Sequence, residues 1–126
     1  MSDTVTLTFA ARTHNAALAR TVAAAMAARA DMPIDQLEDV RLAVDEAVSQ
    51  AILDAPDGSD VECRFTHDGA ELDITVSAPS ASGSTPGTNT FSWMVLSALV
   101  DEVEASIVDG SVTIGMRVVR HVGVDA

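Results

Sequence analysis

The sequence predicts an α+β fold of the two-layer sandwich type, in which a mixed, mostly antiparallel sheet carries helices on one face. Segments with alternating apolar side chains come in pairs joined by short turns, which is the pattern of β-hairpins. Segments with apolar side chains at helical spacing lie between these pairs. No internal repeat and no linker divides the chain, so we expect residues 1–126 to form a single domain.

The chain begins with a predicted strand and a predicted helix. Residues 5–11 (VTLTFAA) alternate apolar side chains with threonines, as in a half-buried strand. Thr13 or Asn15 is placed to cap a helix that runs to about residue 30. The large apolar side chains that repeat at helical spacing on this segment are Leu18, Val22 and Met26.

A longer helix is predicted over residues 34–53. Asp35 near its start favours a helix N-terminus electrostatically, and the Pro-Asp-Gly turn signal at residues 56–58 ends it. One helical stripe of apolar residues must form its core face. The stripe consists of Leu37, Val40, Val44, Ala47, Val48 and Ala51.

The second half of the chain predicts four strands and one short helix. Asp68-Gly69 and Asp109-Gly110 are turn signals, and each lies between two alternating segments. The predicted strands are residues 61–66, 71–77, 102–108 and 111–119. Residues 78–90 (APSASGSTPGTNT) are too polar and too rich in Gly, Pro and Ser for regular structure. Residues 91–100 predict a short buried helix.

The chain carries a formal net charge of -12, from 19 acidic and 7 basic residues. This charge argues against nucleic-acid binding, because phosphates need lysine or arginine partners. It permits steering toward a basic protein partner, and general solubility is the alternative explanation. No signal peptide or spanning segment is recognisable, so we expect a cytoplasmic protein without a membrane partner. The single cysteine, Cys63, lies in an alternating segment and is expected to be a buried structural thiol.

Glu46 and Gln50 are the candidate chemical pair of the sequence. Residues four apart share one side of a helix, so both side chains lie on a flank beside the core stripe. A carboxylate can take a proton from an attacking hydroxyl, and an amide oxygen four residues later can coordinate Mg²⁺ beside it. A solvated helix surface is the alternative interpretation of the same pair.

Four stretches of the chain carry a family resemblance. Residues 46–51 read Glu-Ala-Val-Ser-Gln-Ala, residues 99–103 read Leu-Val-Asp-Glu-Val, and residues 117–121 close the last strand as Arg-Val-Val-Arg-His. In order and spacing these stretches resemble the anti-sigma-factor serine-protein kinases of the GHKL ATPase superfamily, the RsbW type, which share the Bergerat nucleotide-binding fold. Residues 18–20 (Leu-Ala-Arg) match a stretch whose arginine contacts protein partners in related members, which makes Arg20 the expected partner-binding residue.

The resemblance implies a nucleotide site in which contact positions have changed. Family members that bind ATP follow the third strand with Asp-x-Gly, whose aspartate accepts a hydrogen bond from the adenine amino group. Ala78 replaces this aspartate, and Ser80 replaces the glycine. An adenine amino group buried without a partner costs about 1–3 kcal/mol, which is roughly tenfold to a hundredfold in affinity.

Two further departures affect the phosphates and the metal. The family places Gly-Leu-Gly before the third helix to hold the phosphates on backbone amides. Here Thr90 and Ser92 replace the two glycines, and their side chains crowd that close approach. Gln50 replaces the family's asparagine and carries its oxygen one methylene further out, which weakens a Mg²⁺ site because Mg²⁺ requires near-octahedral geometry. Three changes in one pocket favour loss of ATP binding over a modest adjustment of ATP affinity.

The resemblance therefore implies a partner-switching regulator that works without ATP or Mg²⁺. We expect an anti-sigma factor that binds an alternative sigma factor, is displaced by an anti-anti-sigma factor, and forms a homodimer as related members do. Arg20 is the expected interface residue, with an ordinary exposed helix arginine as the alternative. Phe91 and Trp93 either fill the space that nucleotide once occupied or face a partner.

The main alternative is an active serine-protein kinase that phosphorylates its anti-anti-sigma antagonist with ATP and Mg²⁺. In that case Glu46 is the general base and Gln50 is a metal ligand. A scaffold in a stress-signalling cluster that binds no sigma factor is a third interpretation. A nucleotide titration separates the first two.

Overall fold

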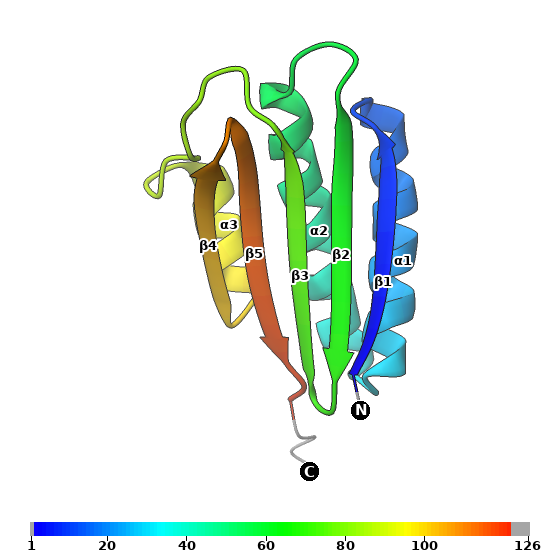
Figure 1. The fold of residues 1–126 in the computed structure, drawn as a ribbon. Helices are drawn as coiled ribbons and strands as arrows, with labels where there is room; N and C mark the ends of the chain where they lie inside the picture. The colour runs from blue at the N-terminus through cyan, green and yellow to red at the C-terminus, as the bar shows by residue number, and fades with distance from the viewer. Residues whose placement is uncertain (1, 122–126) are drawn as a thin grey trace.

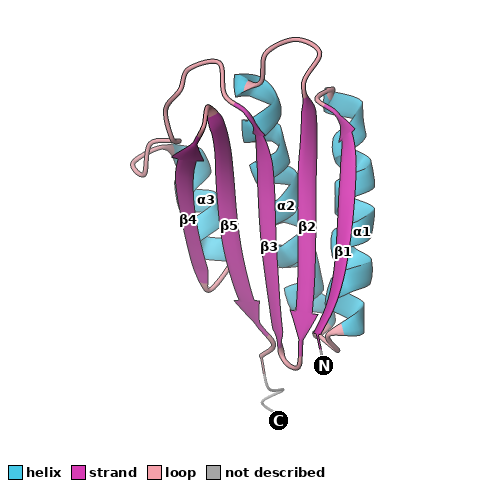
Figure 2. Ribbon diagram, in the orientation of Figure 1, coloured by secondary structure: helices cyan, strands magenta, loops and turns pink. Residues whose placement is uncertain are grey.

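A computed structural model describes residues 2–121 as a five-stranded sheet with three α-helices on one face (Figure 1). The strands are β1 (Ser2–Ala10), β2 (Asp60–Asp68), β3 (Glu71–Pro79), β4 (Glu102–Val108) and β5 (Ser111–Val119). The helices are α1 (Ala16–Arg29), α2 (Ile34–Asp54) and α3 (Phe91–Leu99), with a short 3-10 helix, η1 (Thr13–Asn15), before α1. All three helices lie behind the sheet in Figure 2, so the predicted two-layer α+β sandwich is confirmed.

The sheet has the strand order β1-β2-β3-β5-β4, and each of its pairings is antiparallel. It is therefore more uniform than the mixed arrangement that the sequence predicts. Consecutive strands β2 and β3 form one hairpin, and β4 and β5 form another. The second hairpin joins the first through β5, which leaves β1 and β4 as the two edges of the sheet.

The two hairpin turns follow the signals in the sequence. Asp109 and Gly110, which join β4 to β5, have positive φ values of 52° and 79°, as a type I′ turn requires at both central positions. The turn between β2 and β3 consists of Gly69 and Ala70, because β2 continues to Asp68. Gly69 has a φ of 62° there, a conformation that glycine adopts without strain.

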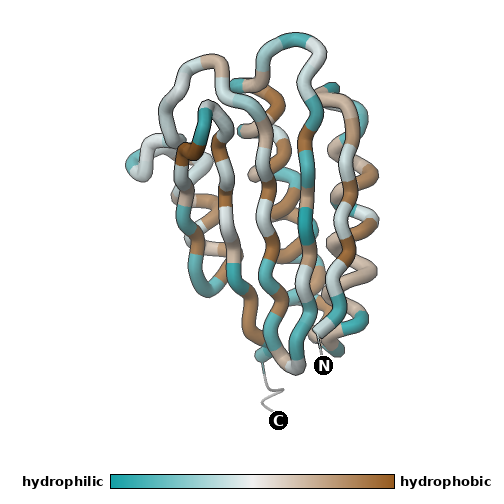
Figure 3. Tube along the Cα trace, in the orientation of Figure 1, coloured by the Kyte–Doolittle hydropathy of each residue, from teal (hydrophilic) through white to brown (hydrophobic). Residues whose placement is uncertain are grey.

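Alternating side chains on the two central strands build the core. Figure 3 shows this alternation of hydropathy along β2 and β3. The buried members face the helices and are Val61, Cys63, Phe65, Leu72, Ile74, Val76 and Ala78. Burial raises the pKa of the Cys63 thiol to about 12, and the charge of Glu62 adds to this effect. The prediction of a buried structural thiol is therefore confirmed.

α1 packs through alanines rather than through its larger side chains. Its buried residues are Ala16, Ala19, Ala23, Met26 and Ala27. Leu18 is 51% exposed, so it is not part of the core face that Met26 belongs to. Positions four apart drift about 40° around a helix at each step, because a turn takes 3.6 residues. Leu18 and Met26 are two such steps apart, so Leu18 lies off the core face while Met26 packs on it among the alanines.

α2 is the longest helix and carries the predicted core stripe. Val40, Val44, Ala47, Val48 and Ala51 are buried, and Leu37 is partly buried, as predicted. Within residues 2–121, no helix is both long enough and apolar enough to cross a membrane.

A buried glutamine on α2 holds the end of β5 against the helices. Gln36 is only 3% exposed. Its Nε2 donates a hydrogen bond to the carbonyl oxygen of Val119 at 2.7 Å, and its Oε1 accepts one from the backbone N–H of His121 at 2.9 Å. Arg120 adds a bond to the carbonyl oxygen of Ala30 at 3.0 Å. Each buried polar group in this contact is therefore paired, as buried polar groups require.

Candidate functional site

Three polar residues, Glu46, Gln50 and Asp54, follow one flank of α2. They are spaced by four, so they lie one above another beside the core stripe of the helix. All three are half-buried. The predicted pairing of Glu46 with Gln50 on one flank is confirmed, and Asp54 extends the row by one more turn.

The carboxylate of Glu46 is occupied by a side chain from α3. The Ser92 hydroxyl donates a hydrogen bond to Glu46 Oε2, which ties the first turn of α3 to the middle of α2. Thr90 caps α3, because its Oγ1 accepts from the backbone N–H of Trp93 at 3.1 Å. Thr90 Oγ1 also donates to the carbonyl oxygen of Gly87 at 2.9 Å. Thr90 and Ser92, the two positions expected to replace phosphate-binding glycines, thus use their side chains for hydrogen bonds at the start of α3.

Asp54, at the end of α2, holds the segment that follows β3. Its Oδ2 accepts hydrogen bonds from the hydroxyls of Ser80 and Ser82, the latter at 3.1 Å, and its Oδ1 accepts from the Ser82 backbone N–H at 3.1 Å. The Ser80 bond is the main reason that the pKa of Asp54 lies below its ordinary value, and partial burial opposes this shift. The backbone N–H of Ala81 also donates to the Asp54 carbonyl oxygen at 2.7 Å. We call this set of bonds the Asp54 latch.

Asp54 is the residue on this flank that the sequence prediction missed. Its spacing from Glu46 and Gln50 was visible, but its partners lie 26 and 28 residues further along the chain. Only the antiparallel course of β2 and β3 brings those serines back to the end of α2. The sequence alone gave no reason to pair them.

A small pocket, which we call the Gln50 pocket, remains between this flank and the segment that follows β3. It has a volume of about 120 Å³ and is lined by Gln50, Ala51, Asp54, Ser82, Ser84, Thr85, Pro86, Val112 and Ile114. Small-molecule sites usually have about 300–1,000 Å³. None of these described lining residues is basic. The pocket is therefore too small for a nucleoside triphosphate and offers no cation to its phosphates.

The other predicted nucleotide positions do not supply what the pocket lacks. Ala78 is buried in β3 at 3% exposure and has no polar side-chain atom to accept from an adenine. Ser80 donates to Asp54 instead of leaving space for a base. Among residues 2–121, no three His, Cys, Asp or Glu side chains form a cluster that could hold a metal ion by itself. In this conformation neither Ala78 nor Ser80 therefore offers a free acceptor to an adenine.

Arg20 lies on a different surface, between α1 and α2. Its Nη1 is 2.6 Å from Asp45 Oδ1, and both side chains are 37% exposed. An open groove of about 400 Å³ runs there, lined by Ala17, Arg20, Thr21, Ala24 and Arg41. Arg20 is thus accessible to a partner, and it does not line the Gln50 pocket.

The sequence leaves open whether Phe91 and Trp93 fill the former nucleotide space or face a partner, and the structure places the two side chains differently. Trp93 is partly buried and packs against the core. Phe91 is 81% exposed. Neither fills the Gln50 pocket, whose lining contains no aromatic side chain among the described residues.

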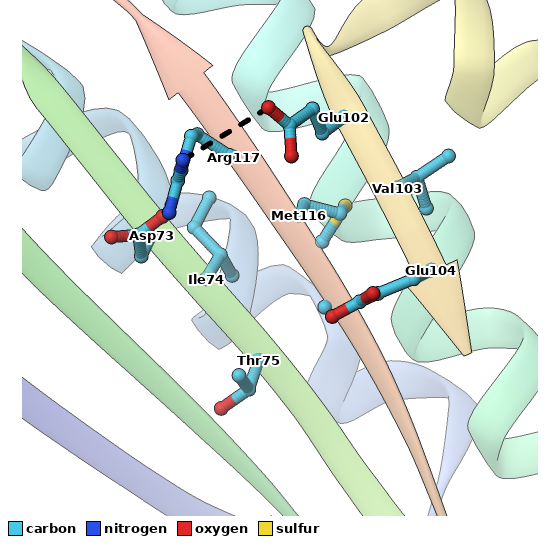
Figure 4. A pocket seen from close by; sticks show the side chains of 9 residues that line it. Asp73, Ile74, Thr75, Glu102, Val103, Glu104, Met116 and Arg117 are labelled. Carbon is cyan, nitrogen blue, oxygen red and sulfur yellow. Dashed lines mark hydrogen bonds and ion pairs between the residues drawn. The ribbon is translucent and has the colours of Figure 1, made fainter. Parts of the chain in front are cut away.

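The open face of the sheet carries a separate hollow of about 200 Å³, shown in Figure 4. It forms at Gly115, which has no side chain between Thr75 and Glu104 on the neighbouring strands. Arg117 lies above it, 3.1 Å from Asp73 and 3.9 Å from Glu102. These carboxylates raise the pKa of Arg117, with the Asp73 hydrogen bond as the main cause. The guanidinium is therefore engaged within the sheet, on the face opposite the helices.

Known proteins place this arrangement in a family. A family model described as histidine kinase-like ATPase domain matches residues 9–118. The anti-sigma-F factor RsbW of two Mycobacterium tuberculosis strains, CDC 1551 / Oshkosh and ATCC 25618 / H37Rv, is 38% identical over 105 residues. The match covers 79% of this chain and 60% of the relative, so the chain spans less than two thirds of the length of these relatives.

A solved structure has the same fold. The crystal structure of the RsbU and RsbW domains of a Mycobacterium tuberculosis protein superposes with a TM-score of 0.69 over 94% of this chain and 32% of that chain. The sequence identity is 19%, so this likeness concerns the fold alone. The family model spans most of the chain, and the expected GHKL-type architecture is present. The chain therefore belongs to the histidine kinase-like ATPase domain family, and its sequence is similar to RsbW-type anti-sigma factors.

Proposed function

We propose that this chain is an anti-sigma factor of a partner-switching system. It binds an alternative sigma factor and releases it when an anti-anti-sigma factor takes its place. The 38% identity to proteins named anti-sigma-F factor RsbW supports this function. The formal net charge of -12 also supports it, because an acidic surface complements the basic regions of a DNA-binding partner.

The observation that carries the proposal is the state of the flank that would hold nucleotide. Glu46 is bonded to Ser92, and Asp54 is bonded to Ser80 and Ser82. The small pocket on this flank is lined by the Asp54 carboxylate and by no basic side chain among the described residues, which disfavours the phosphates of a nucleotide. Function through protein binding needs neither ATP nor Mg²⁺, so weak or lost nucleotide binding is part of the proposal.

A nucleotide titration tests this part. Calorimetry with ATP and Mg²⁺ is expected to give no binding heat up to millimolar nucleotide, because the pocket is small and no basic side chain lines it among the described residues. Fluorescence of Trp93, the single tryptophan, provides an independent signal from within α3. Micromolar binding would contradict the proposal and support an active serine-protein kinase, in which Glu46 acts as base and Gln50 binds the metal.

Direct binding tests the partner. Purified sigma factors of the source organism are titrated against the chain and against Arg20→Glu, which reverses the charge in the α1–α2 groove. We expect one sigma factor to bind and the variant to lose about tenfold or more in affinity, which is about 1.4 kcal/mol. Arg29→Glu is the matched control, because Arg29 is also an α1 arginine in an exposed ion pair, 2.8 Å from Asp3.

Two results would contradict the partner assignment. If none of the sigma factors binds, the chain is not an anti-sigma factor. If Arg29→Glu weakens binding as much as Arg20→Glu, the effect comes from overall charge and Arg20 has no special place at the interface. We also propose that the chain forms a homodimer. Sedimentation velocity at micromolar concentration measures its oligomeric state, and a monomer would contradict this part of the proposal.

A further inference from the structure

The face of the sheet opposite the helices has no covering element. All three helices lie behind the sheet in Figure 2, and no segment of residues 2–121 crosses its front. Along each strand, side chains that face outward alternate with the buried ones. On β3, β4 and β5 the charged residues that face outward are Glu71, Asp73, Glu102, Glu104 and Arg117. This part of the open face therefore has more acidic than basic side chains.

The other two strands do not neutralise this excess. The charged residues of β2 that face outward are Asp60, Glu62, Arg64 and Asp68, so acid exceeds base there too. β1 adds no charge to this face, because its charged residue, Asp3, pairs with Arg29 of α1. The open face as a whole therefore repels a second copy of itself, a nucleic acid and an anionic membrane, and it attracts a basic protein segment.

A hollow lies in this face where one outward side chain is missing, and we call it the Gly115 hollow (Figure 4). Its volume is about 200 Å³. Gly115 pairs with Thr75 on one side and with Glu104 on the other, so these two side chains form opposite walls. An engineered protein cavity of about 150 Å³ holds a benzene molecule. The Gly115 hollow therefore has room for a guanidinium or ammonium group with part of its apolar stem.

The carboxylate of Glu104 is the unmatched charge at the hollow. Arg117 lies 3.1 Å from Asp73 and 3.9 Å from Glu102, so its own charge is already matched. The ion pairs of the described residues do not include Glu104. Its side chain lies over Gly115, because a Cβ at this position would be 3.7 Å from Glu104 Cγ. The hollow thus presents an exposed carboxylate that has no counter-ion among residues 2–121.

We propose that the open face of the sheet binds a basic protein segment, which places one arginine or lysine side chain in the Gly115 hollow. The cationic group pairs with Glu104, and the hydroxyl of Thr75 accepts a hydrogen bond from it on the other wall. Further basic side chains of the segment lie along the carboxylates of β2 and β3. Single exposed ion pairs contribute little, so the binding depends on several pairs acting together with the hollow.

This surface is separate from the groove that contains Arg20. The groove is lined by residues of α1 and α2, in the helix layer, and the Gly115 hollow lies on the other side of the sheet. The inference goes beyond the anti-sigma function proposed above, because it uses neither the family nor the Arg20 groove.

Two synthetic peptides test the site. The first is a flexible glycine–serine segment with arginines, and the second has citrulline at each arginine position, which keeps the shape of the side chain without its charge. Calorimetry measures the affinity, and amide NMR shifts locate the binding. We expect the arginine peptide to shift the amides of Thr75, Glu104 and Gly115, and the citrulline peptide to bind at least about tenfold more weakly. Added salt should weaken the binding, because the ion pairs are exposed.

Variants of outward residues locate the binding further. Glu104→Gln removes the unmatched charge and keeps the size, so it should bind the arginine peptide several-fold more weakly and with less dependence on salt. Gly115→Val fills the hollow and should weaken binding as much. Gly115→Ala should weaken it less, because its Cβ makes only ordinary contacts with Glu104. Glu62→Gln is the matched control: Glu62 is an exposed glutamate of the same face outside the hollow, and its variant should bind nearly as the parent does. Circular dichroism verifies that each variant is folded.

Four outcomes would overturn the proposal. Equal binding of the citrulline peptide would mean that charge is not recognised. Equal weakening by Glu104→Gln and Glu62→Gln would mean that the hollow has no special place on the face. Equal affinity for agmatine, the decarboxylated form of arginine, would make the ligand a small amine rather than a protein segment. A dimer of the chain that dissociates in Gly115→Val would show that a second copy covers this face. The peptides contain no sigma-factor sequence and no nucleotide, so this proposal and the proposed function can fail separately.

Discussion

At the scale of single residues, the contact between Asp54 and Ser80 shows that an altered nucleotide position has a structural role. The replacement of a family glycine by Ser80 is not only the loss of a small residue. Ser80 donates to Asp54, and its backbone N–H donates to the carbonyl oxygen of Gly110 at 2.8 Å. The serine therefore fastens the end of β3 to both α2 and the β4–β5 turn. A position that reads as a defect in an ATP site is a structural contact in this protein.

The Asp54 latch should make stability depend on pH. The pKa of Asp54 is lowered in the folded state from an ordinary value of 3.8. Its stabilisation is therefore fully present above pH 3.8 and is lost as the pH falls through the folded pKa. At neutral pH we expect Asp54→Asn to unfold at a lower urea concentration than the parent. Its free energy of unfolding should fall by less than about 1 kcal/mol, because solvent screens the Asp54 carboxylate. In acid, below the folded pKa, the two proteins should be equal.

Asp57→Asn is the control for this prediction. Asp57 lies three residues later, is exposed, and is outside the latch. Its substitution should leave the urea midpoint unchanged at both pH values. Limited proteolysis with a broad-specificity protease gives a local readout, since Asp54→Asn should be cut faster within residues 80–90. A difference between Asp54→Asn and the parent that persists in acid would contradict the role of the charge.

At the scale of secondary-structure elements, α1 shows how small residues set the distance between helices. Ala19 and Ala23 have no exposed surface, and Ala43 and Ala47 on α2 have none either. Alanine has no side-chain atoms beyond Cβ, so the two helices can pack closely along these faces. A larger side chain on this face has no space to enter, because protein interiors are close-packed.

This packing predicts a clear difference between two alanines of α1. Ala23→Leu should lower the free energy of unfolding by about 1–3 kcal/mol, because overpacking forces the backbone or the neighbouring side chains to move. Ala25→Leu is the matched control: Ala25 is exposed on the same helix, and leucine has a helix propensity close to that of alanine. Urea unfolding of both variants measures the difference. Equal stability would mean that the α1–α2 contact has room to expand.

At the scale of the whole molecule, the excess of acidic residues opposes compaction. Nineteen acidic and seven basic residues give the net charge of -12, and the ion pairs of the described residues lie at the surface. Exposed ion pairs contribute little to stability. The repulsion among the remaining carboxylates acts on the folded state as a whole. We therefore expect repulsion to outweigh attraction between charges at low ionic strength.

Salt should accordingly stabilise the protein. Raising the ionic strength from about 10 mM to about 1 M shortens the screening length from about 30 Å to about 3 Å. The melting temperature is expected to rise by about 2–5 °C over this range, which corresponds to about 1 kcal/mol for a domain of this size. Scanning calorimetry in sodium chloride measures it. A falling melting temperature would mean that the ion pairs at Arg20, Arg29 and Arg117 stabilise more than the repulsion destabilises.

The sequence by itself determined the elements and the layer arrangement. Alternation on the strands and helical spacing on α2 are local properties, and they predicted each strand and helix to within a few residues. Turn residues such as Asp109-Gly110 fixed the hairpins, because positive φ favours few residue types. Helical spacing alone did not decide which side of α1 is buried: Leu18 repeats with Val22 and Met26, yet it is 51% exposed while alanines pack on the core face.

Only the tertiary structure decided how the altered site is filled. The latch joins residues 26 and 28 positions apart, and the Ser92–Glu46 bond spans 46 positions. No periodicity in the sequence encodes such pairs, because they exist only after the sheet has returned the chain to α2. The exposure of Phe91 and the burial of Trp93 depend in the same way on which side of α3 meets the core. The sequence placed Glu46 and Gln50 on one flank of α2, and packing determined which side chain contacts Glu46.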